Sequence, residues 1–323
     1  MENKATSTPL RYISDHPDFQ GFVKIVAAAW SLPAGTIEKD YWVIRVLREL
    51  QNSEFQDEFV FKGGTCLSKA YKIIERFSED IDLLFIQTVD TISKNSKRRR
   101  LEKLKDFVAS ISGLTYLPEK SMVKKLAATI YFDYNKNPDN KLEGEVSSQI
   151  LLEPGYRGGT SPRTLIKPIN SFVGDYLIDK GFQDLAEDIP PFDVKVLCLE
   201  RIFAEKLCAV KSLHDNRSLK LRTRHYYDLF NLLTTPDIKN LVKNKDELTL
   251  ILQDISDISE EHFNTEKITL QDIQLCDAFN PEHNCIKELA NSYKDKRSKE
   301  LYYNTQPEFG HMITEISGFL KLL

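Results

Sequence analysis

Residues 61–85 read FKGGTCLSKAYKIIERFSEDIDLLF, and this stretch decides the fold of the chain. A short apolar run breaks at Gly63-Gly64-Thr65, a helix-like segment follows, and the stretch ends in Asp80-Ile81-Asp82 before a second apolar run. The pattern predicts a strand, a turn, a helix and a second strand. Because strand residues alternate between the two faces, Asp80 and Asp82 are expected to project side by side from one face.

The two halves of this stretch predict one site. Adjacent carboxylates repel each other unless a cation compensates, and carboxylate oxygens suit Mg²⁺ beside substrate phosphates. Glycines without Cβ atoms let the backbone approach a ligand closely, and the N–H groups that open the following helix favour an anion. Each half alone is common. Together in one unit they indicate metal-assisted chemistry on a nucleoside triphosphate, with Mg²⁺ as the cofactor and two ions expected.

The pattern resembles the signature of the DNA polymerase β-type nucleotidyltransferase superfamily. More closely, it is similar to the AbiEii-type toxins, which include the mycobacterial MenT proteins. The similar pieces occur in the family's order over roughly residues 35–233. They are IEKDYWV (37–43), KGGT (62–65), LSK (67–69), RFSEDIDL (76–83), FAEKL (203–207) and RHYYDL (224–229).

The resemblance implies nucleotidyl transfer, in which an acceptor attacks the α-phosphate of a nucleotide and pyrophosphate leaves. Asp80 and Asp82 would hold the metal ions, and Glu153 would supply a third carboxylate, with Glu143 and Glu145 as weaker candidates. The residues implied in nucleotide binding or catalysis are Lys62, Gly63, Gly64, Thr65, Ser68, Ser78, Lys206 and Asp228. The resemblance also implies a toxin of a toxin–antitoxin, abortive-infection or phage-defence system, an antitoxin partner, and the acceptor end of tRNA as substrate.

Helical periodicity predicts different environments for the side chains of Lys206 and Asp228. Lys206 lies in the middle of an apolar stripe of the helix expected over 197–213, so an anion must meet its ammonium or its stem must reach the surface. Asp228 lies nearly opposite the apolar stripe of the helix expected over 222–233, so the pattern predicts an exposed side chain paired with Arg224. Only the resemblance implies a role for Asp228 in the site.

Composition sets limits on partners. The formal net charge of −4 gives no global attraction to nucleic acid, so an RNA contact requires a local basic patch. Lys97, Arg98, Arg99 and Arg100 form the densest basic run, which is either a solvated helix face or a contact to an RNA backbone. Five scattered cysteines without a C-x-x-C pattern suggest neither a zinc site nor a disulfide framework. We expect a cytoplasmic protein that does not interact with a membrane.

The expected fold class is α/β (α+β). A nucleotidyltransferase core with a mixed sheet and leading helices is predicted over 1–165, and a mostly helical domain over 166–323. Two other functions stay open: transfer to a protein hydroxyl, and a non-catalytic nucleotide-binding module.

Overall fold

The structure is a computed structural model that describes residues 9–86, 93–143, 146–156, 163–263, 267–297, 302 and 306–323. The strands are β1 (Phe59–Lys62), β2 (Asp80–Phe85), β3 (Leu114–Tyr116), β4 (Met122–Val123), β5 (Ala128–Tyr134), β6 (Ile150–Gly155), β7 (Thr164–Ile169) and β8 (Phe192–Leu197). The α-helices are α1 (Phe19–Trp30), α2 (Ala34–Gln51), α3 (Gly63–Lys69), α4 (Lys94–Ala109), α5 (Phe172–Asp179), α6 (Leu199–Asp215), α7 (Arg224–Leu233), α8 (Pro236–Leu241), α9 (Lys245–Phe263), α10 (Leu270–Gln274), α11 (Cys285–Arg297) and α12 (Phe309–Leu322). Short 3₁₀ helices are η1 (Ile13–Asp15), η2 (Gln183–Leu185), η3 (Leu219–Arg222) and η4 (Asp277–Phe279).

All of the described strands belong to one mixed sheet in the order β3-β5-β6-β2-β1-β8-β7, with β4 paired to β5 off this path. Strand β2 runs antiparallel to β1 and parallel to β6, and β1 runs parallel to β8. Strands β2 and β6 are far apart in the sequence, but hydrogen bonds make them neighbours in the sheet. The α/β class with a mixed sheet, predicted from the sequence, is confirmed.

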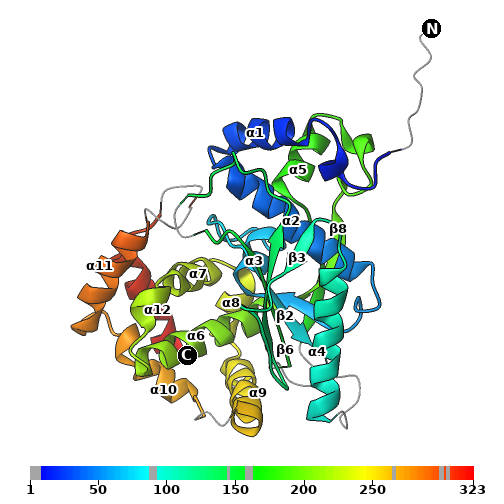
Figure 1. The fold of residues 1–323 in the computed structure, drawn as a ribbon. Helices are drawn as coiled ribbons and strands as arrows, with labels where there is room; N and C mark the ends of the chain where they lie inside the picture. Colours follow the sequence, from blue (N-terminus) through cyan, green and yellow to red (C-terminus); the bar gives the residue numbers. More distant parts are fainter. Residues whose placement is uncertain are drawn as a thin grey trace.

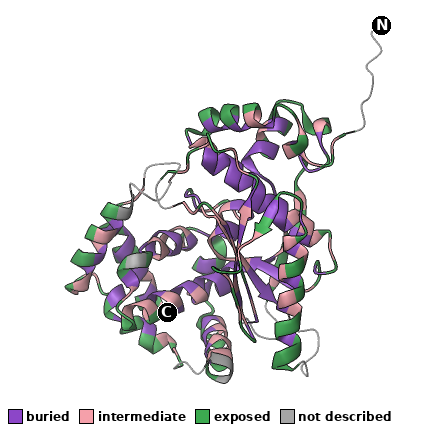
Figure 2. Cartoon of the chain, in the orientation of Figure 1, coloured by how far each residue is buried: buried purple, intermediate pink, exposed green. Residues whose placement is uncertain are grey.

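Helices cover both faces of the sheet (Figure 1). Helix α4 packs against β3, β4 and β5 on one side, while α6 lies on the other side and contacts α7, α8, α9 and α10. Helices α1, α2 and α5 pack together at one end of the sheet. Because both faces are covered, much of the central sheet is buried (Figure 2), and Phe59, Val60 and Phe61 of β1 are 0% exposed.

The elements expected in the deciding stretch occur where the pattern places them: a strand ends at Lys62, a helix begins at Gly63, and the second strand begins at Asp80. Strand β6 extends to Gly155 and therefore contains Glu153. The division near residue 165 stays a prediction. Strand β7 crosses that boundary, β8 follows it, and both belong to the sheet, whereas the continuous helical part begins at Leu199. No helix within the described ranges is both long and apolar enough to cross a membrane.

Candidate active site

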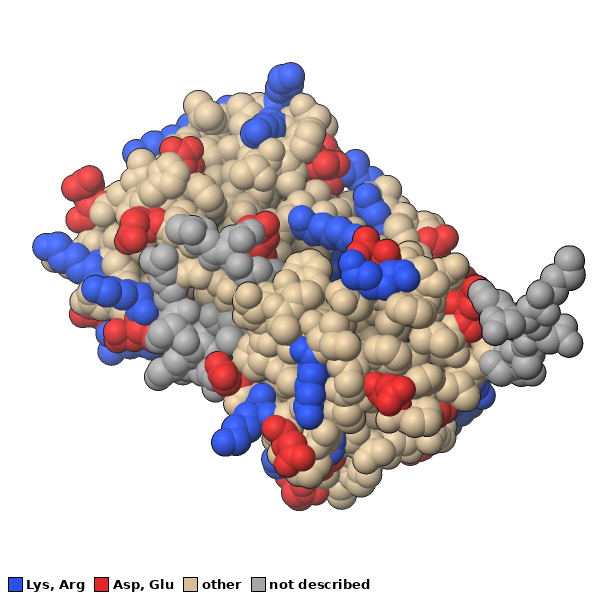
Figure 3. Space-filling view, turned by 90° about the horizontal axis from the view of Figure 1, so that it is seen from above, with Lys and Arg blue, Asp and Glu red and all other residues tan. Residues whose placement is uncertain are grey.

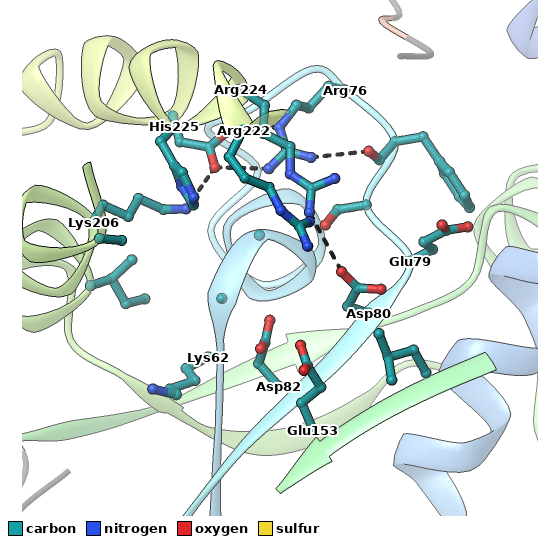
Figure 4. Close-up of a pocket in the computed structure, with 18 of the residues that line it drawn as sticks. Lys62, Arg76, Glu79, Asp80, Asp82, Glu153, Lys206, Arg222, Arg224 and His225 are labelled. Atoms are coloured by element: carbon teal, nitrogen blue, oxygen red, sulfur yellow. Dashed lines mark hydrogen bonds and ion pairs between the residues drawn. The ribbon is translucent and has the colours of Figure 1, made fainter. Parts of the chain in front are cut away.

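A pocket of about 610 Å³ opens between the sheet and helices α6 and α7 (Figure 4). Acidic groups from the sheet side and basic groups from the helix side meet in it. The lining residues that carry chemistry are Lys62, Gly63, Gly64, Arg76, Ser78, Glu79, Asp80, Asp82, Glu153, Glu205, Lys206, Arg222, Arg224, His225 and Asp228.

Three carboxylates line the sheet side of the pocket. Asp80 and Asp82 lie two residues apart on β2, so they share a face of the sheet. In the parallel pairing of β2 with β6, Glu153 is the direct register partner of Asp82. Figure 4 shows the three side chains next to one another. The register therefore brings together the two aspartates predicted from the local pattern and the glutamate predicted from the resemblance.

These carboxylates are too close to stay charged at no cost. Burial, together with Asp80 and Glu153, raises the pKa of Asp82 to about 7. Burial and Asp80 likewise raise the pKa of Glu153. Among the described residues, the cation that pairs with this set is Arg224, whose Nη2 atom lies 3.7 Å from Oδ2 of Asp80. The set is thus short of positive charge, which a bound cation would supply.

The donor set fits a hard divalent ion. Carboxylate oxygens suit Mg²⁺, which usually takes one or two protein carboxylates and completes its shell with water and substrate phosphates. Among the described residues, no three His, Cys, Asp or Glu side chains stand close enough to form a ready-made ligand cluster. Like charges repel, so we expect the three carboxylates to draw together only when a cation lies between them.

The Gly-Gly turn is packed tightly against the carboxylates and the basic side. Gly63 has a φ of +76°, and a Cβ atom there would lie 1.9 Å from Oδ2 of Asp82. A Cβ atom on Gly64 would lie 2.6 Å from the Ser78 hydroxyl and 2.8 Å from Nη2 of Arg76. No side chain fits at either position. The turn therefore presents bare backbone to the pocket.

Of the other residues predicted to bind nucleotide, some line the pocket and some do not. Ser78 and Lys62 line the pocket, and Lys62 donates to Glu205 at 2.8 Å. Thr65 lies beneath the pocket, where its hydroxyl donates to the Asp80 carbonyl at 2.6 Å and so fixes the start of β2. Ser68 is half-buried on α3 and does not line the pocket.

A buried ion-pair cluster forms the helix side of the pocket. Arg76 donates from Nε and Nη2 to the two carboxylate oxygens of Asp228, at 2.8 Å each, and Lys206 donates to Oδ2 at 2.6 Å. Burial alone would raise the pKa of Asp228, but Arg76 and Lys206 hold it below its usual range. The anion that meets Lys206 within the described chain is thus Asp228.

The exposure predicted for Asp228 from helical periodicity is wrong, because Asp228 is 0% exposed. The pattern fails because two cations from distant segments neutralise the carboxylate and make burial possible. Arg224, the expected i, i+4 partner, lies beside Asp80 instead. The resemblance, by contrast, placed Asp228 in the site, and it lines the pocket.

Sequence reasoning missed six of these pocket residues: Arg76, Glu79, Glu205, Arg222, Arg224 and His225. Arg76 and Arg224 stand inside quoted motifs, but no periodicity indicated where they point. Burial and the nearby Lys206 lower the pKa of His225 well below its ordinary value, so its ring is neutral. Its Nδ1 atom is buried without a hydrogen-bond partner among the described residues.

The basic run Lys97–Arg100 lies on α4 and lines no part of this pocket. Lys97 is buried, with its ammonium 5.3 Å from the centre of the Tyr156 ring, and Arg100 pairs with Glu54 and Glu58. Arg98 and Arg99 are exposed. An RNA contact by this run stays a prediction, at a surface separate from the pocket.

A bare Gly-Gly turn facing carboxylates on adjacent strands, opposite a wall of cations, defines the nucleotidyltransferase class. Residues 45–308 match the family described as nucleotidyl transferase AbiEii toxin, type IV TA system. The chain therefore belongs to the AbiEii family of nucleotidyltransferase toxins, and the resemblance seen in the motifs is confirmed.

Among solved structures, the chain is similar to a candidate nucleotidyltransferase from H. pylori, with 17% identity and a TM-score of 0.43 over 88% of this chain and 92% of that one. None of the curated proteins matches the chain.

Proposed function

We propose that this protein transfers a nucleoside monophosphate from a nucleoside triphosphate to the 3′ acceptor end of tRNA in the cytoplasm, with release of pyrophosphate. By analogy with the MenT proteins, it would act as a toxin of a toxin–antitoxin system that serves phage defence. An antitoxin would be its partner. The observation that carries the proposal is the β2–β6 register, which sets Asp82 directly opposite Glu153 in a pocket whose other wall is cationic.

Each wall has a separate task in this reaction. Asp80, Asp82 and Glu153 would hold Mg²⁺, which, when bound, activates the attacking oxygen and neutralises the leaving group. Lys206 and Arg76 would face the β- and γ-phosphates. Of the three N–H donors of the Lys206 ammonium, Asp228 takes one, which leaves others for phosphate oxygens.

Asp228 acts through the two cations that it holds. The carboxylate engages both Arg76 and Lys206, so it orients them toward the pocket without competing for the metal. This gives Asp228 a positioning role, which pattern and spacing alone did not supply. The missing Cβ atoms at Gly63 and Gly64 leave room for the side chains of Asp82, Ser78 and Arg76, so the acidic and basic walls both pack directly against the turn.

Two arginines that line the pocket favour an acceptor that carries phosphates. Arg222 is exposed, and Arg224 is half-buried beside Asp80. The face seen in Figure 3 carries Lys and Arg interspersed with Asp and Glu rather than a basic field. A local contact at Arg222 and Arg224 therefore supports binding of a short acceptor end more than binding of a long duplex.

The test incubates the purified chain with each α-³²P-labelled nucleoside triphosphate, Mg²⁺ and total tRNA. Asp82→Asn removes a pocket carboxylate, and Asp139→Asn is a matched change at an exposed loop residue. We expect labelled tRNA with wild type and Asp139→Asn but not with Asp82→Asn. Label on protein alone would assign a protein hydroxyl as acceptor. Absence of label with every nucleotide and acceptor would overturn the proposal.

A further inference from the structure

Helix α2 buries three consecutive charged residues: Glu38, Lys39 and Asp40 are 1%, 0% and 2% exposed. Burying charge costs free energy, and well-packed apolar side chains at such positions are often at least as stabilising. Stability alone therefore does not explain why charged residues occupy these buried positions. These residues belong to the motif at 37–43 and do not line the pocket, so the proposed reaction has not accounted for them.

The hydrogen-bonding capacity of the Lys39 ammonium is fully used. Its ammonium donates to Oε2 of Glu79 at 2.5 Å and to the carbonyl oxygens of Ser147 and Gln149, at 2.7 Å each. An ammonium has three N–H donors, so every donor has an acceptor. Glu79 in turn accepts from the Ser147 N–H at 3.0 Å. Lys39 therefore ties two chain segments, 79 and 147–149, to one point on α2.

Those two segments lead directly into the strands that carry the pocket carboxylates. Glu79 precedes Asp80, the first residue of β2, and Gln149 precedes Ile150, the first residue of β6. Downstream of the tie, the two strands run parallel in the register that pairs Asp82 with Glu153. A slip of one residue would turn Glu153 to the opposite face of the sheet, away from Asp82.

We infer that Lys39 is a positioning residue that fixes the relative register of β2 and β6 at their starts and thereby holds the carboxylates of Asp82 and Glu153 on one side of the pocket. The inference rests on the proposed function, because it assigns these carboxylates to a divalent cation. Lys39 acts through Glu79 and the backbone at Ser147 and Gln149, and it touches neither metal nor nucleotide. The neighbouring Asp40 contacts other segments, accepting from Lys69 and from the Phe172 N–H at 2.8 Å.

The test measures binding of Mn²⁺ alone to the full chain by electron paramagnetic resonance, with circular dichroism as the check on folding. Residues that orient metal ligands typically contribute about 10–100-fold to metal affinity. We therefore expect Lys39→Met to weaken Mn²⁺ binding at least about tenfold. Glu79→Gln should weaken it in the same direction, and it keeps the test decisive if Lys39→Met does not fold. The double variant should be little worse than either single variant, because both break the same tie.

Asp188→Asn is the matched control. Asp188 is buried and also anchors α2, by accepting from the Tyr41 hydroxyl at 2.8 Å and from the Ile13 N–H at 2.7 Å, but it lies outside the pocket. Its loss should lower the melting temperature and leave Mn²⁺ affinity unchanged.

The outcomes separate the two ideas. Equal Mn²⁺ affinity in wild type and in folded Lys39→Met and Glu79→Gln would overturn the role of Lys39 while leaving the proposed transfer intact. If wild type binds no Mn²⁺, the carboxylate site and this inference fall together. If Mn²⁺ binding weakens as expected but no acceptor is labelled, the positioning role stands and the proposed transfer fails.

Discussion

The Asp228 carboxylate is predicted to be one of the most sensitive single positions for stability. Its side chain is 0% exposed, and it neutralises Arg76 and Lys206, whose side chains are 4% and 9% exposed. Asp228→Asn keeps the shape but leaves two buried cations without a counter-ion, which costs about 3–5 kcal/mol when one partner of a buried pair is removed. Lys206→Met leaves the two Arg76 bonds to Asp228 in place, so it should cost only ~1–2 kcal/mol.

Urea denaturation followed by tryptophan fluorescence measures the difference. With a slope of about 3 kcal/mol per molar urea, Asp228→Asn should lower the midpoint by roughly 1 M or more, and Lys206→Met by about half of that or less. Asp179→Asn, at a carboxylate that is 71% exposed, is the control and should change stability by less than about 0.5 kcal/mol.

The pH dependence has a defined sign. Because the pairing lowers the pKa of Asp228 in the folded state, the stabilisation is present above the unfolded pKa of about 3.9 and is lost as pH falls below it. The gap between wild type and Asp228→Asn should therefore shrink in acid. A loss below about 1 kcal/mol at pH 7, or a larger loss for Lys206→Met, would refute the reasoning.

Three further predictions concern the carboxylate side of the pocket. The pKa of Asp82 is raised to about 7, so without metal its contribution to stability is fully present below the unfolded pKa of about 3.9 and is lost as pH rises from there through 7. In a chelator, Asp82→Asn should therefore be more stable than wild type at pH 8, by on the order of 2 kcal/mol after allowance for partial exposure, and this difference should shrink as pH falls toward 4; a difference that does not change with pH would count against it. Gly63→Ala should abolish transfer through its clash with Asp82, whereas Gly21→Ala, with no atom within 4 Å of the new Cβ, should leave transfer and fold intact. Glu153→Gln should raise the Mg²⁺ concentration for half-maximal transfer about tenfold, and the exposed Glu143→Gln should not; identical metal titrations would remove Glu153 from the site.

The sequence predicts the features of this site that depend on near neighbours. Period-two alternation places Asp80 and Asp82 on one face, and the turn at Gly63-Gly64 follows from residue type. The family motifs predict that Lys206 and Asp228 belong to the site, although they do not show that the two bind each other. Local patterns and motifs together therefore supply a set of residues without their arrangement.

The rest depends on contacts between distant segments. Glu153 faces Asp82 only because β6 pairs with β2 in one register, and no local pattern encodes that pairing. Asp228 fails the periodicity argument because its burial is compensated by Arg76, 152 positions earlier. The ammonium of Lys39 is satisfied in part by backbone carbonyls more than 100 positions away. The same physical rules for burial apply in each case, but only the fold shows which distant residue pairs with each of these side chains.

The long separations in this site also order events during synthesis on the ribosome. Arg76, Asp80 and Asp82 leave the ribosome well before Asp228, which lies 152 positions after its partner Arg76. At a translation rate of about 5–20 residues per second, that interval lasts on the order of ten seconds. Until it ends, the nascent chain carries the acidic strand of the pocket without Asp228 on the opposite wall, and Lys206 is added only 22 positions before Asp228. A ribosome that stops within this interval releases a chain with an incomplete pocket, so the cell meets an assembled toxin only once the helical part has been translated.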